Sequence, residues 1–86
     1  MRTIRIRKLR AEEAKYKLER ELHEAFQAGE QYVEVLHGIG EGVLKRITQE
    51  FVTSSGFSRL LPTDPMFPGN PGITKVELFP PGVNRI

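Results

Sequence analysis

The most informative part of this 86-residue chain is Val33-Glu34-Val35-Leu36-His37-Gly38-Ile39-Gly40-Glu41-Gly42-Val43-Leu44. Residues 31–36 alternate in polarity and are rich in β-branched side chains, which predicts a strand with one buried face. From Val43 to Val52, apolar residues recur at three- and four-residue spacing, which predicts an amphipathic helix ending at residues 53–56. Three glycines at alternate positions separate the predicted strand from the predicted helix. The stretch is therefore predicted to be strand, glycine-rich turn and helix.

The flanking segments extend this unit in both directions. Residues 3–7 predict a short strand that buries Ile4 and Ile6, and residues 11–28 predict a helix stopped by Gly29. Two strands joined by a helix form a βαβ unit, so they are expected to be parallel. Residues 57–61 and 73–79 predict two more strands, separated by a Pro/Gly-rich loop at 62–72 and followed by a tail at 80–86. The expected fold is α+β, a β-α-β-α-β-β two-layer sandwich with two helices on a four-stranded mixed sheet, in a single domain over residues 1–86.

Composition excludes several classes of function. The chain has no cysteine, so disulfides, thiolate metal sites and cysteine nucleophiles are absent. No apolar run approaches the ~20 residues that span a bilayer, and the basic N-terminus lacks the apolar segment of a secretory signal. These features predict a cytoplasmic protein with no membrane partner. Residues 1–20 hold eight basic and three acidic side chains, whereas the rest of the chain carries an acidic excess. This asymmetry suggests an anionic partner, most often a nucleic acid (DNA or RNA), and a solvated charged segment is the alternative that charge alone leaves open.

The glycine-rich turn is a candidate phosphate site. Gly38, Gly40 and Gly42 allow close backbone approach with N–H groups turned toward a ligand, and the following helix start adds free N–H groups. Lys45 and Arg46 are placed to reach the same or neighbouring phosphates. The alternative is a plain strand-to-helix connection, and the negative charge of Glu41 speaks against an anion there. The spacing matches neither a dinucleotide fingerprint nor a P-loop.

His37 is the candidate catalytic residue. It follows a strand beside the glycine turn, and imidazole can act as a general acid or base near neutral pH. Its alternative role is a hydrogen bond across the turn. His23 lies on the polar side of the first helix with no visible partner, so no role is predicted for it.

Three segments of the chain resemble a known domain family. Residues 35–44 resemble the H-G-x-G-x-G-x-L signature of the small MutS-related (Smr) domain, found in a MutS paralogue and in stand-alone bacterial proteins. Residues 10–14 resemble the start of that family's first helix, and residues 76–78 its last strand. The resemblance covers Ile4 to Leu78 and implies a βαβαββ fold, nucleic-acid binding and, in several members, nicking of DNA or cleavage of RNA.

One departure from the family pattern bears on activity. The family's L-D-L-H-G motif aligns without gaps on Ile4-Arg5-Ile6-Arg7-Lys8, so arginine replaces both the aspartate and the histidine associated with nuclease chemistry. Arginine neither accepts a proton at neutral pH nor binds a metal cation, but it binds phosphate well. The substitution is expected to exchange a catalytic site for a cationic one.

Three functions follow as hypotheses. The first is a nucleic-acid-binding Smr-like module with nuclease activity reduced or lost. Its phosphate-binding surface is formed by two sets of residues: Arg5, Arg7 and Lys8 on the first strand and its turn, and Gly38, Gly40, Gly42, Lys45 and Arg46 around the second helix start. The second is an active nicking endonuclease that uses His37 and the glycine turn. The third is a protein-interaction module docking through residues 62–72, where Met66 and Phe67 are either exposed or folded over the core. No cofactor is evident, no metal site is assigned, and a divalent metal requirement stays open.

Overall fold

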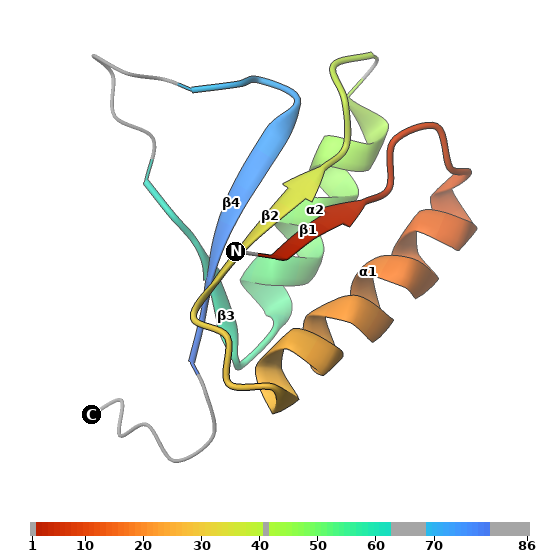
Figure 1. Cartoon of the computed structure of the whole chain (residues 1–86). Coiled ribbons are helices and arrows are strands. Elements are labelled where there is room, and N and C mark those ends of the chain that lie inside the picture. Colours follow the sequence, from red (N-terminus) through yellow and green to blue (C-terminus); the bar gives the residue numbers. More distant parts are fainter. Residues whose placement is uncertain (1, 41, 63–68, 80–86) are drawn as a thin grey trace.

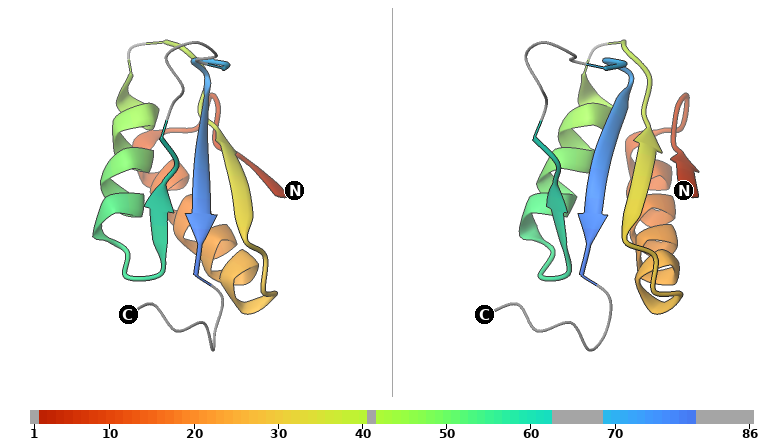
Figure 2. Two further views of the ribbon diagram at one scale, coloured as in Figure 1. Left: turned by 90° about the vertical axis from the view of Figure 1, so that its left-hand side faces the viewer. Right: turned by 60° about the vertical axis from the view of Figure 1, so that its left-hand side comes forward.

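The computed structural model describes residues 2–40, 42–62 and 69–79. Its elements are β1 (Arg2–Arg5), α1 (Ala11–Gln27), β2 (Tyr32–Leu36), α2 (Val43–Ser54), β3 (Ser58–Leu60) and β4 (Ile73–Leu78). The four strands form one sheet in the order β1-β2-β4-β3, with β1 and β2 parallel and the other two pairs antiparallel. Both helices cover the same face of this sheet, as Figures 1 and 2 show. The predicted α+β sandwich with a mixed sheet and a parallel first pair is confirmed.

The core lies between the sheet and the two helices, and its members follow the predicted periodicities. The strands and the residues next to them contribute side chains at alternate positions, and the helices contribute side chains at three- and four-residue spacing. The buried apolar residues are Ile4, Ile6, Val33, Val35, Val76 and Leu78 from the sheet, and Ala14, Leu18, Leu22, Ala25, Ile47 and Val52 from the helices. Val43, expected on the apolar side, is instead 41% exposed at the first position of α2.

The end of α1 has the geometry predicted from its glycine. Gly29 adopts a φ of +79°, its N–H donates to the carbonyl of Phe26, and the N–H of Glu30 donates to the carbonyl of Ala25. This pair of bonds is the Schellman arrangement, which satisfies carbonyls that the helix leaves without partners. It also turns the chain sharply into β2.

Some boundaries and one side chain differ from expectation. β1 ends at Arg5 rather than at residue 7, because the chain turns at Arg7 and Lys8. β3 begins at Ser58, and the ring of Phe57 packs against the rings of Phe26 at 4.8 Å and His23 at 4.9 Å. His23 therefore has an aromatic partner that the sequence did not suggest.

The remaining expectations concern the loop, the tail and the membrane. Residues 63–68, with Met66 and Phe67, and the tail at 80–86 lie outside the described residues. Within the described part, neither helix is long and apolar enough to cross a bilayer.

Candidate nucleic-acid interface

One edge of the sheet brings together the segments singled out by the sequence. Because β1 and β2 are parallel, their carboxyl ends meet at the same edge, and antiparallel β4 begins there. The amino end of α2 lies at this edge too (Figure 1). The turn after β1, the glycine-rich turn after β2 and residues 69–72 before β4 are therefore neighbours in space.

Backbone hydrogen bonds clamp the end of β2 from both sides. The carbonyl of Leu36 accepts from the N–H groups of Ile6 at 3.0 Å and Arg7 at 3.1 Å. The carbonyl of Gly72 accepts from the N–H groups of His37 and Gly38, both at 3.0 Å. The N–H of Gly38 is thus committed to the protein, which corrects the expectation that it is turned toward a ligand.

These segments line a cleft of about 620 Å³. Seven of the nine predicted site residues line it, from both halves of the predicted site. They are Arg7, Lys8, His37, Gly38, Gly40, Gly42 and Lys45. Arg5 and Arg46 do not. Ile4 and Ile6 are buried under the helices, so Arg5 between them lies on the opposite face of the sheet. Arg46 follows Lys45 by one helical step, which turns it to another side of α2.

Two residues of the cleft were missed by sequence reasoning. Asn70 and Gly72 precede β4, and the Asn-Pro-Gly sequence there signals a turn but not its position in space. The side-chain Oδ1 of Asn70 accepts a 2.8 Å hydrogen bond from the N–H of Gly72. A Cβ on Gly72 would lie 3.3 Å from the Cα of Gly38, so a larger residue there would push the two backbones apart.

The Arg7 side chain crosses directly over Gly38. A Cβ placed on Gly38 would lie 3.1 Å from the Cγ of Arg7, and Gly38 has a φ of +81°. Glycine is therefore favoured at this position both by its backbone conformation and by close packing. The contact holds the base of the Arg7 side chain at the cleft wall.

The start of α2 contributes backbone donors to the cleft. The N–H of Arg46 donates to the carbonyl of Gly42 at 3.0 Å, so the N–H groups of Val43, Leu44 and Lys45 precede the hydrogen-bond ladder of the helix. Such groups carry partial positive charge and favour anions. Lys45 adds a full positive charge at the same place.

Lys8 adopts a glycine-like backbone conformation. Its φ is +68°, and among the described residues it is the only non-glycine residue with positive φ. It lies in a turn closed by the Leu9 N–H donating to the carbonyl of Ile6 at 3.1 Å. Lys8 is also the position that aligns with the glycine of L-D-L-H-G. A glycine at this position would adopt the same left-handed backbone without strain.

His37 is 4% exposed, and both of its ring nitrogens have partners. Nδ1 lies 2.8 Å from the carbonyl oxygen of Gly38, and Nε2 lies 2.8 Å from the hydroxyl of Thr74. A carbonyl only accepts, so Nδ1 carries a proton; in the neutral ring, Nε2 then accepts from the Thr74 hydroxyl. His37 would have to release Thr74 before it could accept a proton from a substrate. The bonds across the turn that its structural role requires are present, and its catalytic role stays a prediction.

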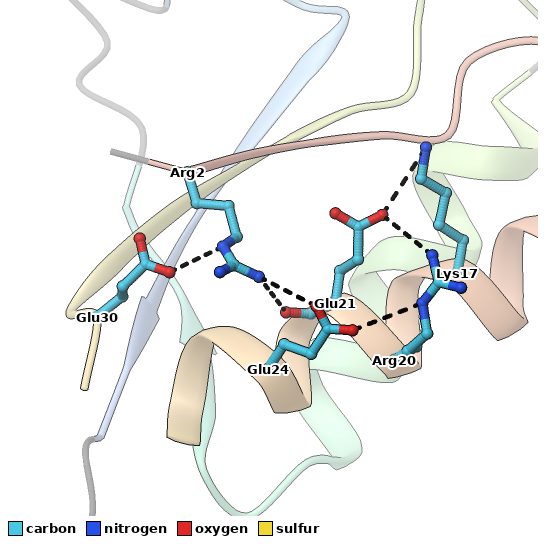
Figure 3. Close-up of polar contacts among 6 residues, drawn as sticks. All are labelled: Arg2, Lys17, Arg20, Glu21, Glu24 and Glu30. Carbon is cyan, nitrogen blue, oxygen red and sulfur yellow. Dashed lines mark hydrogen bonds and ion pairs between the residues drawn. The ribbon is translucent and has the colours of Figure 1, made fainter. Parts of the chain in front are cut away.

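Ion pairs divide the basic residues into two groups. Arg2, Lys17 and Arg20 form a network with Glu21, Glu24 and Glu30 (Figure 3). Its shortest contact joins Arg2 Nε to Glu30 Oε2 at 2.8 Å, and Arg2 also donates to the carbonyl of Glu21 at 3.4 Å. Lys15 pairs with Glu12. This network lies away from the cleft and binds β1 to α1.

The cations of the cleft belong to the second group, the basic side chains that no described carboxylate pairs with. Arg7, Lys8 and Lys45 are exposed, and no carboxylate of the described residues pairs with them. The basic excess at the N-terminus therefore overstates the charge available to a partner, since four of the eight basic side chains of residues 1–20 are paired with carboxylates. Glu41, whose charge argued against an anion, lies outside the described residues. Residues 2–40, 42–62 and 69–79 contain no group of three His, Asp or Glu side chains arranged to hold a metal ion.

Comparison with known proteins identifies a family and a structural relative. A family model of the Smr domain matches residues 4–79. The crystal structure of the Smr domain of Thermus thermophilus MutS2 is similar, with a TM-score of 0.80 and 27% sequence identity. The match covers 93% of this chain and 100% of that one. Among curated proteins, none matches the sequence.

Proposed function

Since this chain belongs to the Smr domain family, we propose that it binds nucleic acid through the phosphate backbone, with nuclease activity reduced or lost. The observation that carries the proposal is the convergence of Arg7, Lys8 and Lys45 on one cleft beside the amino end of α2. Each is exposed and unpaired by carboxylates of the described residues. Phosphates spaced along a strand match such a row of cations, whereas a single small anion would use only part of it.

The proposed loss of nuclease activity rests on two separate observations. Arg5 and Arg7 stand where the family's motif has aspartate and histidine, and guanidinium groups provide neither a general base nor a metal ligand. His37, the other candidate, is buried and hydrogen-bonded at both nitrogens. On this proposal, phosphate binding is kept while cleavage is reduced or lost.

Binding is tested with matched charge reversals on fluorescently labelled DNA and RNA oligonucleotides. Arg7→Glu is paired with Arg5→Glu, and Lys45→Glu with Arg46→Glu, because each pair makes the same charge change inside and outside the cleft. If three phosphates are neutralised, affinity for duplex DNA falls about 40-fold between about 50 and 200 mM salt. We expect each variant inside the cleft to bind about tenfold more weakly than the wild type. We expect its matched control outside the cleft to lose much less affinity. Affinity that is flat with salt, or equal losses within each pair, would contradict the proposal.

Catalysis is tested by nicking of supercoiled plasmid with and without divalent metal. We expect the wild type to bind the plasmid and leave it intact. The alternative of an active endonuclease requires nicking that His37→Ala abolishes. Nicking that persists in that variant would point to a contaminating nuclease.

A further inference from the structure

The cleft has an apolar wall as well as a cationic one. Ile39 is 71% exposed and Val43 is 41% exposed, and both line the cleft with Leu36 and Leu44. The other two exposed large hydrophobic residues of the described chain are Tyr16 on α1 and Tyr32 at the opposite end of β2. Exposed aliphatic side chains are thus gathered beside the cations, where phosphate binding alone gives them nothing to contact.

Ile39 follows a residue that is anchored to the rest of the domain. The glycines on either side of it have positive φ, +81° at Gly38 and +45° at Gly40. The N–H of Gly38 is bound to the carbonyl of Gly72, and its own carbonyl accepts from the His37 ring. The anchored Gly38 limits the positions of the neighbouring Ile39 side chain and so lowers the entropy cost of its contact with a ligand.

The cationic and apolar residues of the cleft together indicate a ligand with both an anionic group and an apolar surface. A nucleotide carries an anionic phosphate and an apolar base face, and the cleft volume of about 620 Å³ lies within the ~300–1,000 Å³ range of small-molecule sites. In a fully paired duplex the base faces are stacked and hidden, so only an unpaired or displaced base can offer one to Ile39. Isoleucine is among the side chains that proteins insert beside or between bases.

We propose that Ile39 is a specificity-determining residue that contacts the face of an unpaired base, with Val43 beside it, while Arg7, Lys8 and Lys45 hold the adjoining phosphates. This inference rests on the proposed nucleic-acid binding and deepens it. The domain then prefers single strands, and duplexes with an extra unpaired nucleotide, over fully paired duplexes.

The test uses three probes of matched length: a fully paired duplex, the same duplex with one extra unpaired nucleotide, and a single strand. Each is measured with the wild type, Ile39→Ala and, as a control that removes an exposed hydrophobic side chain away from the cleft, Tyr32→Ala. We expect the wild type and Tyr32→Ala to favour the unpaired probes by about fivefold to tenfold. We expect Ile39→Ala to lose this preference while its affinity for the paired duplex stays the same.

A second variant reports the contact between residue 39 and a base by fluorescence. The chain has no tryptophan, so Ile39→Trp introduces a single indole at the tip of the turn. Stacking on a base is expected to quench its fluorescence with the unpaired probes and not with the paired duplex.

The outcomes separate the two proposals. Equal affinity for all three probes, or a preference that survives in Ile39→Ala, would overturn the role of Ile39 while leaving phosphate binding intact. Failure of the wild type to bind any probe at low salt would overturn nucleic-acid binding itself, and the role of Ile39 with it.

Discussion

Replacing Lys8 by glycine is expected to make the domain more stable and its binding weaker. Lys8 has a φ of +68° in the turn that joins β1 to α1, a conformation in which its Cβ is crowded. The left-handed region costs a non-glycine residue about 1–2 kcal/mol, which glycine avoids. Glycine also loses about 0.4–1 kcal/mol more chain entropy on folding. The middle values of the two ranges leave a gain of about 0.8 kcal/mol, or about 3–6 °C in melting temperature for a domain of this size.

Lys8→Ala is the matched control, because alanine removes the charge but keeps the Cβ. Its unfolding free energy is expected to stay within about 0.5 kcal/mol of the wild type. Both variants lose one cation of the cleft, so both should bind nucleic acid more weakly and show a salt slope smaller by about 1. Urea and thermal unfolding followed by circular dichroism measure stability, and fluorescence anisotropy measures binding. If Lys8→Gly is no more stable than Lys8→Ala, the argument from backbone strain is wrong. Unchanged affinity in both variants would remove Lys8 from the binding surface.

Three further changes test the packing around the cleft and the charge network. Gly38→Ala should lower the unfolding free energy, measured in urea, by about 1–2 kcal/mol. This loss should exceed that of Gly29→Ala, because Gly29 has a similar positive φ but a Cβ there would meet no neighbouring atom. Thr74→Val should lower it by about 1–3 kcal/mol, because the buried Nε2 of His37 loses its hydroxyl partner. Arg2→Gln should lower it by about 1 kcal/mol or less, with the effect shrinking as salt is added and little change in nucleic-acid affinity.

Equal losses for Gly38→Ala and Gly29→Ala would mean that the close approach of the Arg7 side chain carries no energy. Thr3→Val, on the exposed side of β1, makes the same change as Thr74→Val without a buried partner and should be nearly neutral. Nucleic-acid affinity that falls as steeply in Arg2→Gln as in Arg7→Glu would extend the binding surface to the ion-pair network.

The elements of this fold were predictable because their signals are local. Alternation around Ile4 and Val35, and the helical spacing of Leu18 and Leu22, report which face each segment buries, and burial dominates the energetics of so small a domain. The stop at Gly29 follows from one residue's backbone freedom. The parallel pairing of β1 with β2 follows from the helix between them. Strand ends were less predictable, since β1 ends at Arg5, just before the turn at Arg7 and Lys8, although the alternation continues through Ile6.

The arrangement of the cleft depended on contacts between residues far apart in the chain. Thr74 reaches the ring of His37 across 37 positions, and the carbonyl of Gly72 takes the N–H of Gly38, so a donor that looked free is used internally. Arg5 and Arg7 are the same residue type two positions apart, and the sequence does not distinguish them. The pleat of β1 and the turn after it place only Arg7 in the cleft. Arg2, Lys17 and Arg20 have carboxylate partners that α1 and the turn after it bring to them. The net charge of the sequence does not show which cations are paired, because the partner of each charge is set by packing between elements of the folded chain.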